Sequence, residues 1–377
     1  MESQSFYNSC VQSLKTPSSE NYYNIDFFSF QNDENQEPKK EYSPKSTDYQ
    51  PKENYSFSLE MDIKLLLNSV KTHQGSITYQ WFISSLLPND IQSLLIKLCP
   101  YLIEIMCSNY GNYFFQKLLQ KLNLNQRLLI FSIIHNHFIQ ICANKSGTYS
   151  IQALIDVIKT PNEEKMLQAL IENHLIFLFT NENAHHIIQK IIIDFPEEKR
   201  EYLNNCLFQN LDKICINEYG TSCVVKFIIL NTNLIYRIEL IKAINKFFRF
   251  LLGNRFGCSI ILFMIEKYGI GYSGFVFREL KNSLLFLSSN KKVAVPLVVK
   301  VLNTLSKYDK FNFLTMTWDL LKNENLLYTM MNFENGINIL LAILKNSTQE
   351  QKNYLKIKKI NLFNSNLNDK KYMHLMI

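Results

Sequence analysis

One short pattern recurs along most of this chain and limits its fold more than any other feature. It is a small residue, a polar pair and an apolar stretch, as in YGNYFFQKLL around Gly111 and SGTYSIQALI around Gly147. The small residue is the anchor of each copy, and the eight anchors are Gly75, Gly111, Gly147, Ala184, Gly220, Gly257 and, in two weaker copies, Val293 and Asn335. They are spaced 36, 36, 37, 36, 37, 36 and 42 residues apart. This spacing predicts an array of stacked supersecondary units.

Each unit is predicted to be helical. Apolar residues recur at helical spacing from Leu59 onward, and only 10 Gly and 9 Pro interrupt the 377 residues. Amphipathic stretches such as NQRLLIFSIIHNHFIQICA lie between the anchored segments. Asparagine stands three residues before six anchors, at 144, 181, 217, 254, 290 and 332, where it can cap a helix N-terminus. One repeat cannot bury its apolar face alone, so we expect an all-α solenoid without strands.

The residues one, two and five places after the anchor (positions one, two and five) form a polar triplet. Positions one and five are four residues apart and share a helix face, whereas position two points about a third of a turn away. In the second copy these are Asn112, Tyr113 and Gln116. The intervening residues are apolar and are expected to face the core; they are Phe114, Phe115, Leu118 and Leu119.

The first four copies place glutamine at position five each time. Their triplets are Ser76, Ile77 and Gln80; Asn112, Tyr113 and Gln116; Thr148, Tyr149 and Gln152; His185, His186 and Gln189. A glutamine amide has a donor and an acceptor that match the edge of a base, and planar Tyr and His side chains can stack on bases. A row of such surface-facing sites suits single-stranded RNA.

The period, the anchored glycine and triplets such as G-N-Y-x-x-Q-K resemble the Pumilio (PUF) family of RNA-binding repeat proteins over residues 59–350. The resemblance implies a right-handed α-solenoid, a curved superhelix of eight Pumilio-type repeats of about 36 residues, in which each repeat reads about one base. It implies an RNA antiparallel to the protein, with no cofactor and no metal.

The resemblance also assigns roles to the first four triplets. It implies a uracil reader in Asn112 and Gln116 with Tyr113 stacking, and an adenine reader in Ser76 and Gln80 beside Ile77. Thr148 and Gln152, with Tyr149, resemble an adenine-reading class. His185 stands beside Gln189 where the family commonly has Asn, and His186 matches its stacking histidine. The implied 3′ segment is U-A-U-A.

The last four copies depart from the family pattern. Thr221 and Ser222 are followed by Val225, and Cys258 and Ser259 by Leu262; these four polar residues remain candidate RNA contacts. The seventh copy has Ala294, Val295 and Val298, and the eighth has Gly336, Ile337 and Leu340. The resemblance implies that these two copies would read the G and the first U of a U-G-U core. Neither can hydrogen-bond a guanine edge in that way, so recognition of U-G-U stays open. The seventh copy is either structural or faces a protein partner, and Pro296 fits only in the first turn of its helix.

Three lysines recur directly after position five, at Lys117, Lys190 and Lys226. Contacts to RNA phosphates and contacts between repeats are both open for them. The net charge of +7 and the pI of about 8.8 are compatible with a polyanionic partner without requiring one.

Catalysis and metal binding are not expected. Adjacent side chains on a helix diverge by about 100°, so His185 and His186 are predicted to have separate roles and not to bind one metal. His135 and His137 lack a nearby ligand partner, and no phosphate-binding glycine loop or H-E-x-x-H motif occurs. The eight cysteines show no two-residue spacing, which favours reduced, buried thiols.

Two regions are predicted. Residues 1–56 are polar and proline-containing, which indicates a disordered tail, and residues 57–377 form the RNA-binding domain of eight repeats with a C-terminal cap. Within the tail, NIDFFSFQ (24–31) is either a docking peptide or a chance aromatic cluster. No secretory signal or membrane-spanning run is evident. The expected location is cytoplasmic, with the nucleus and nucleolus open.

We expect a monomeric, non-catalytic protein that binds A/U-rich elements in mRNA 3′ untranslated regions. It would regulate translation or mRNA stability by recruiting repression or deadenylation factors. Two alternatives remain open: a nucleolar Pumilio-like protein of ribosome assembly, and a helical-repeat scaffold that binds proteins. A mixed interpretation has RNA on the N-terminal half and protein on the C-terminal half.

Overall fold

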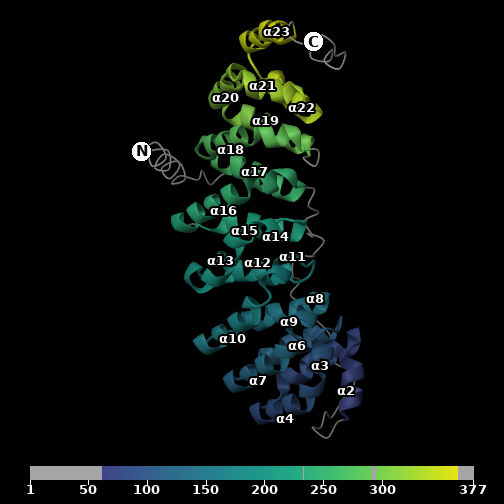
Figure 1. The fold of residues 1–377 in the computed structure, drawn as a ribbon. Coiled ribbons are helices and arrows are strands. Elements are labelled where there is room, and N and C mark those ends of the chain that lie inside the picture. Colours follow the sequence, from purple (N-terminus) through teal and green to yellow (C-terminus); the bar gives the residue numbers. More distant parts are fainter. Residues whose placement is uncertain (1–61, 232, 291–293, 364–377) are drawn as a thin grey trace, which may run out of the picture. The chain divides into compact units, whose positions relative to one another are not determined.

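The structure, a computed structural model, describes residues 62–231, 233–290 and 294–363 (Figure 1). Every regular element in these ranges is a helix, which confirms the all-α prediction. The described residues form two compact units that divide after Cys206, within helix α13. The predicted tail (1–56) and the 24–31 peptide lie outside the described residues.

The N-terminal unit carries the first four copies. Its helices are α2 (Ile63–Val70), α3 (His73–Ser85), α4 (Pro88–Leu98), η2 (Cys99–Tyr101), α5 (Leu102–Met106), α6 (Gly111–Leu119), α7 (Leu124–Ile134), η3 (His135–His137), α8 (Phe138–Ala143), α9 (Lys145–Asp156), α10 (Pro161–Glu172), α11 (Leu175–Thr180), α12 (His185–Asp194), η4 (Glu197–Arg200) and α13 (Glu201–Gln209).

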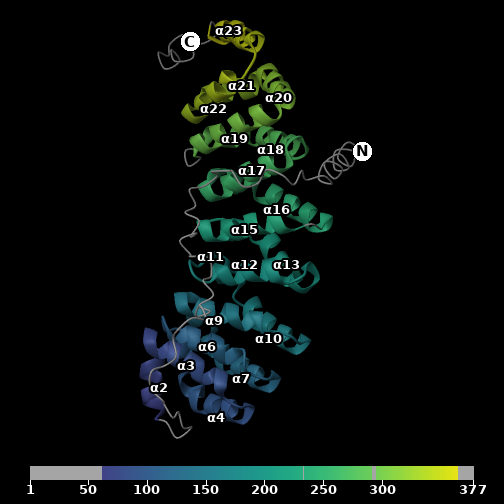
Figure 2. The same ribbon diagram turned by 180° about the vertical axis from the view of Figure 1, so that it is seen from behind.

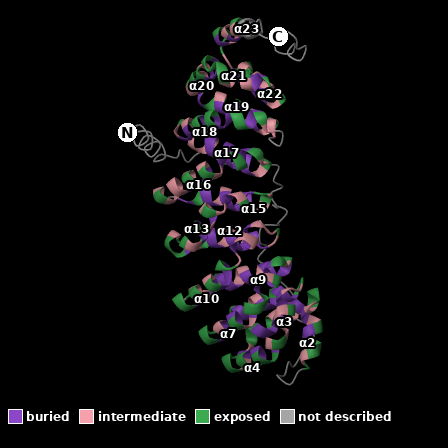
Figure 3. Ribbon diagram, viewed as in Figure 1, coloured by how far each residue is buried: buried purple, intermediate pink, exposed green. Residues whose placement is uncertain are grey.

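The anchored helices of this unit stack in sequence order. Helix α3 packs on α6, α6 on α9, and α9 on α12. Helices α4, α7 and α10 form a second row on the other side of the unit (Figures 1 and 2). The apolar side chains between the rows are buried (Figure 3), and Phe114, Phe115, Leu118 and Leu119 face the core as predicted.

The C-terminal unit carries the remaining anchored helices. Its helices are α14 (Leu211–Ile214), α15 (Glu218–Leu230), α16 (Leu234–Gly253), α17 (Arg255–Tyr268), α18 (Ile270–Ser289), α19 (Val295–Tyr308), α20 (Lys310–Lys322), α21 (Glu324–Met331), α22 (Glu334–Lys345) and α23 (Gln349–Phe363). Helices α15, α17, α19 and α22 stack in order, and α16, α18, α20 and α23 form the second row.

Where the anchor is glycine, it lies in close contact with the backbone of the preceding helix. A Cβ added at Gly147 or Gly220 would overlap the carbonyl oxygen of the residue six places earlier, Ile141 or Ile214. The residue three places before the anchor caps the anchor's N–H: Asn144 Oδ1 accepts from Gly147 N at 2.9 Å, and Asn217, Asn181 and Asn254 act alike. The predicted capping role is therefore confirmed for Asn144, Asn217 and Asn254, whereas Asn181 bonds to Ala184 before α12 begins at His185.

The structure corrects the predicted anchor of the eighth copy. Gly336, not Asn335, has the close approach six residues back, because a Cβ there would overlap the carbonyl oxygen of Met330. Asn332 follows the last residue of α21 and does not cap α22. Positions one, two and five of this copy are therefore Ile337, Asn338 and Leu341.

The seventh copy is shifted by five residues from its predicted anchor. Cys258, at position one of the sixth copy, donates to the carbonyl oxygen of Leu297 at 3.8 Å. In the first copy, Ser76 makes the same bond to Tyr110, the residue just before the next anchor. By this equivalence the seventh anchor is Val298.

The limits of α19 agree with this register. Helix α19 ends at Tyr308, ten residues after Val298, as α15 ends ten residues after Gly220. Asn290 follows the last residue of α18 and does not cap α19, whose first turn contains Pro296, where proline was expected to be tolerated. The corrected positions one, two and five are Val299, Lys300 and Asn303.

Polar contacts join neighbouring repeats in the second row of each unit. Arg127 Nε donates to Glu163 Oε1 at 2.6 Å, and both side chains are buried. In the C-terminal unit, Ser273 Oγ donates to Asp309 Oδ2 at 2.5 Å. Within the described ranges, no helix has both the length and the apolar composition needed to cross a membrane.

Candidate nucleic-acid interface

Position one is buried in each of the first four copies. Ser76, Asn112 and Thr148 are each 2% exposed, and His185 is 7% exposed. The glutamines at position five are half-buried, so part of each side chain is exposed to solvent. Position one is therefore less exposed than expected, and its polar atoms bond mainly within the protein, so its contact with a ligand stays a prediction.

The second copy shows what position one does. Asn112 Nδ2 donates to the backbone carbonyls of Ser108 (2.9 Å) and Asn109 (3.0 Å). Because both amide hydrogens are used, Asn112 Oδ1 must accept, and it does so from Gln116 Nε2 at 3.0 Å. This chain of bonds fixes the orientation of the Gln116 amide. Its second N–H and its carbonyl oxygen are what it can offer to a ligand.

The first copy is arranged in the same way. Ser76 Oγ donates to the carbonyl oxygen of Tyr110 at 2.8 Å and accepts from Gln80 Nε2 at 3.2 Å. A hydroxyl has one hydrogen, so the bond to Tyr110 leaves only its lone pairs for Gln80. Positions one and five are thus brought together, as predicted, and the glutamine again offers one N–H and its carbonyl oxygen.

The third and fourth copies use position one differently. Thr148 Oγ1 donates to the carbonyl oxygen of Cys142 at 2.9 Å. His185 Nδ1 lies 3.2 Å from the carbonyl oxygen of Asn181, which can only accept, so this nitrogen carries the hydrogen. The rings of His185 and His186 lie 4.0 Å apart and tilted by 37°. The two side chains were predicted to point about 100° apart, but their rings lie close together, so this prediction is wrong for the rings.

The described residues hold no group of three or more His, Cys, Asp and Glu side chains that could bind a metal ion. This includes the neighbourhoods of His185 and His186 and of His135 and His137, which lie in η3. The seven cysteines within the described ranges are free thiols.

In the second copy, position two is the most accessible place of the triplet. Tyr113 is 42% exposed at the surface of α6. The side chains at this place in the other three N-terminal copies are half-buried: Ile77, Tyr149 and His186. Tyr113, Tyr149 and His186 therefore present part of a planar surface beside each glutamine, as a stacking role requires.

The fifth and sixth copies lack this arrangement. Thr221 is buried and donates to the carbonyl oxygen of Asn217 at 2.9 Å. Cys258 is 1% and Ser259 5% exposed, and Leu262 at position five is also buried. Only Ser222 and Val225 are half-exposed. The predicted contacts Thr221, Cys258 and Ser259 present almost no surface to a ligand.

The three recurring lysines are not equivalent. Lys190 Nζ pairs with Asp156 at 2.5 Å and with Asp194 at 2.7 Å, and its side chain is largely buried. Burial alone would lower the pKa of Lys190, but the two carboxylates outweigh burial and raise it. Lys190 therefore links repeats, whereas Lys117 and Lys226 lie half-exposed on their helices.

The two units differ strongly in charge. Residues 62–206 contain 12 Lys and Arg against 12 Asp and Glu, a net charge of zero. Residues 207–363 contain 21 Lys and Arg against 10 Asp and Glu, a net charge of +11. The unit with glutamine triplets is thus neutral, and the unit without them carries the positive charge. The net charge of the whole chain, +7, does not reveal this difference between the two units.

Comparison with protein families finds the Pumilio-family RNA binding repeat at residues 101–135 and 137–171. Both matches lie in the N-terminal unit and contain the second and third copies. Each spans a short helix, an anchored helix and the helix that follows, which supports a repeat of about three helices.

The curated relatives include Putative pumilio homolog 8, chloroplastic, of Arabidopsis thaliana, 25% identical over 59% of this chain and 43% of the relative. Suppressor protein MPT5 of Saccharomyces cerevisiae is 23% identical over 54% of this chain and 25% of that protein. The chain thus matches less than half the length of these relatives.

Two solved structures share the fold. The Puf4 RNA binding domain, bound to the HO endonuclease RNA 3′ UTR recognition sequence, has a TM-score of 0.57 at 21% identity, covering 84% of this chain and 98% of that one. The RNA-binding domain of yeast Puf5p, bound to AAT2 RNA, has a TM-score of 0.57 at 20% identity, covering 86% and 97%.

Proposed function

We propose that this chain is a Pumilio-family repeat protein and that it binds single-stranded RNA in a sequence-specific manner. The observation that carries the proposal is the oriented amide of Gln116. Asn112 takes one of its N–H groups, so the other N–H and the carbonyl oxygen are left as an adjacent donor and acceptor.

Such a pair complements the edge of a uracil, whose N3–H donates beside a carbonyl oxygen that accepts. Gln80, oriented by Ser76, offers the same pair to an adenine, whose amino group donates beside a ring nitrogen that accepts. An amide that is already oriented loses less side-chain entropy on binding. The planar side chains of Tyr113, Tyr149 and His186 would stack on the faces of the bases.

On this proposal, the four N-terminal copies read a 3′ segment of the type U-A-U-A. The natural targets would be A/U-rich elements in mRNA 3′ untranslated regions, and the outcome would be control of translation or mRNA stability in the cytoplasm. The protein would act as a monomer without catalysis, through repression or deadenylation factors that it recruits.

The test is equilibrium binding of the full chain to labelled single-stranded RNA at fixed salt. We expect an RNA that contains U-A-U-A to bind about 5- to 150-fold more tightly than RNAs in which one of these bases is changed to guanine, as each mismatch costs about 1–3 kcal/mol. Equal affinity for all of these RNAs would refute sequence-specific binding.

A further inference from the structure

Three exposed apolar side chains follow one another along the C-terminal unit. Each lies in the first turn of a second-row helix, directly after the chain turns back from an anchored helix. They are Ile235 on α16, Ile270 on α18 and Phe311 on α20, and they are 66%, 69% and 79% exposed. Helices α16, α18 and α20 stack in this order (Figure 1), so the three side chains form a row, which we call the turn edge.

Polar contacts hold neighbouring turns of this edge together. Lys267 Nζ, beside the turn from α17 to α18, donates to the carbonyl oxygen of Ile228, near the end of α15, at 2.6 Å. Ser273 Oγ, in α18, donates to Asp309 Oδ2, directly before α20, at 2.5 Å. The three turns are therefore fixed side by side and present their apolar side chains on one surface.

The fold does not require apolar side chains at this place. In the third and fourth copies, the second residue of the corresponding helix is Asn162 or Glu198, and both are exposed. An isolated exposed apolar side chain is common on protein surfaces, whereas a group of them marks a place where another molecule binds. The turn edge is such a group, because it repeats over three consecutive copies.

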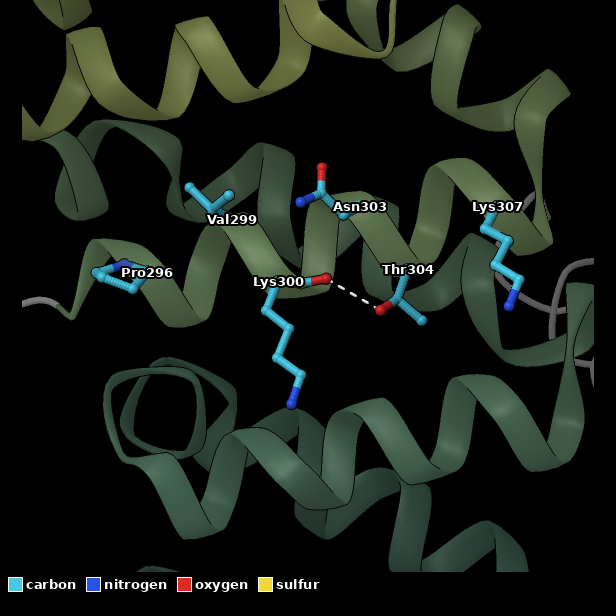
Figure 4. Close-up of a pocket in the computed structure, with 6 residues that line it drawn as sticks. All are labelled: Pro296, Val299, Lys300, Asn303, Thr304 and Lys307. Atoms are coloured by element: carbon cyan, nitrogen blue, oxygen red, sulfur yellow. Dashed lines mark hydrogen bonds between the residues drawn. The ribbon is translucent and has the colours of Figure 1, made fainter. Parts of the chain in front are cut away.

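The turn edge is also positively charged. Lys267 and Lys310 donate to backbone carbonyl oxygens, which leave their positive charge in place, and burial lowers the pKa of Lys267 only to about 8. Lys307 lies in the last turn of α19, where a hollow of about 370 Å³ along this helix ends (Figure 4). The same turns contain two carboxyl groups, Glu266 and Asp309. Burial raises the pKa of Glu266, and Asp309 is buried, so the exposed charge is mainly positive.

One segment of this chain has the complementary composition. Residues 24–37, NIDFFSFQNDENQE, lie outside the described residues and contain Ile25, Phe27, Phe28 and Phe30. The segment has four Asp and Glu and no Lys or Arg, whereas residues 38–52 have four Lys against two Asp and Glu. Residues 38–61 connect the segment to α2, and a chain of that length spans up to about 80 Å. The connection is thus long enough to bring the segment to a surface of either unit.

We propose that residues 24–37 dock on the turn edge. Their phenylalanine side chains pack against Ile235, Ile270 and Phe311, and their carboxylates lie beside the lysines of the edge. Apolar contact supplies the affinity, and charge selects this acidic segment over the basic residues that follow it. The turn edge lies at the opposite end of the anchored helices from the triplets, so this inference does not depend on RNA binding.

The test uses the full chain and a fluorescein-labelled peptide of residues 23–37, without RNA. In the wild type, the chain's own segment occupies the turn edge and competes with the peptide. Phe27→Ser with Phe28→Ser and Phe30→Ser, the open variant, removes this competitor. Fluorescence anisotropy at neutral pH should show that the peptide binds the open variant at least about tenfold more tightly than the wild type, because a linked segment competes at high effective concentration.

Two further pairs of substitutions, each made in the open variant, locate the site. Ile235→Ser with Ile270→Ser removes two members of the turn edge and should weaken peptide binding at least about tenfold. Phe250→Ser with Leu285→Ser is the matched control, because these side chains lie fifteen residues later on the same two helices and are 44% and 51% exposed. The control should keep the affinity within about twofold. Circular dichroism checks that every variant is folded.

The role of charge has its own test. A peptide with Asn and Gln in place of its four carboxylates should bind the open variant at least about threefold more weakly at low salt, because exposed charges are least screened there. Equal affinity of the two peptides would show that the lysines of the edge do not select the segment.

Three other results would overturn the proposal. Equal binding of the peptide to the wild type and the open variant would show that the chain's own segment does not occupy the site. A loss in the Phe250 and Leu285 variant, with none in the Ile235 and Ile270 variant, would place the site at the other end of α16 and α18. If the peptide binds neither protein, and sedimentation shows that Ile235→Ser with Ile270→Ser converts a dimer to a monomer, the turn edge joins two copies of the chain instead.

Discussion

The two units of the chain share one scaffold but present different chemistry on it. In both, small anchors lie against the preceding helix, and the anchored helices stack in sequence order. The N-terminal unit is neutral and holds glutamine amides in fixed orientations. The C-terminal unit has a net charge of +11, and its fifth and sixth copies have Val225 and Leu262 in place of the glutamines. The contrast teaches that the scaffold and the side chains it presents can vary separately.

The second rows differ as well. In the N-terminal unit, α7, η3 and α8 follow one another over residues 124–143, with a 3₁₀ turn at His135–His137 between two α-helices. In the C-terminal unit, α16 and α18 each run for 20 residues without a break. The difference concerns the rows away from the triplets, so it does not explain the loss of the glutamines.

The largest predicted effect concerns the buried ion pair of the N-terminal unit. Glu163→Gln leaves the buried Arg127 guanidinium without a charged partner, so we expect a loss of about 3–5 kcal/mol in the free energy of unfolding, measured by urea denaturation. Glu164→Gln is the matched control, because Lys199, its partner at 2.6 Å, is half exposed; it should cost less than about 1 kcal/mol. Equal losses in the two variants would contradict the role of the buried pair.

The same carboxylate gives a pH dependence. Burial would raise the pKa of Glu163, but Arg127 and the donors at Lys159 and Thr160 outweigh burial and lower it. A lowered folded-state pKa means that the stability from Glu163 is complete above its ordinary pKa, about 4.3, and is lost as the pH falls through the folded-state value. Wild-type stability should therefore fall below about pH 4 more steeply than that of Glu163→Gln. If the stability of the two proteins falls in parallel with pH, Glu163 does not contribute to the pH dependence.

The shared anchor geometry predicts a smaller loss. Gly220→Ala places a Cβ against the carbonyl oxygen of Ile214, and we expect it to cost about 1–3 kcal/mol of unfolding free energy. The control is Gly253→Ala, where the added Cβ meets nothing within 4 Å and alanine favours the helix. Calorimetric melting should separate the two variants. If Gly220→Ala leaves the free energy of unfolding unchanged, α14 and α15 can move apart with little loss of stability.

The contrast in base reading can be tested at position five. Gln116→Ala removes the oriented amide, and we expect affinity for the U-A-U-A strand to fall by about 1–3 kcal/mol with the preference at one base lost. Val225→Ala changes the same place in the fifth copy and should leave the base preferences as they are. If Val225→Ala loses a base preference, or if Gln116→Ala keeps its base preference and affinity, the assignment of base reading to the N-terminal unit is wrong.

The smallest effect is expected at Lys190. Because Asp156 and Asp194 hold its ammonium group, Lys190→Gln should leave the salt dependence of RNA binding unchanged and cost less than about 1 kcal/mol of stability. Binding isotherms at two salt concentrations are sufficient. A reduced slope would show that Lys190 exchanges its carboxylate partners for phosphate.

The sequence predicted the helical repeat and the contrast between the two halves, because glycine anchors and asparagine caps are local requirements with local signatures. It misplaced the seventh copy because NKKV at residues 290–293 imitates a cap and anchor. The bond from Cys258 to Leu297 and the limits of α19 show that the helix starts later. Lys300 and Asn303 were missed for the same reason. The burial of position one was also missed, since it depends on backbone carbonyls of neighbouring turns and copies that a helical pattern does not show.

The central claim, which rests on the proposed function, is that base reading belongs to the N-terminal unit. Selection of random RNA against the full chain, followed by sequencing, measures this directly. We predict an enriched segment of the type U-A-U-A with no base preference on its 5′ side. An enriched core 5′ of that segment, a guanine-rich motif or no enrichment at all would contradict the account.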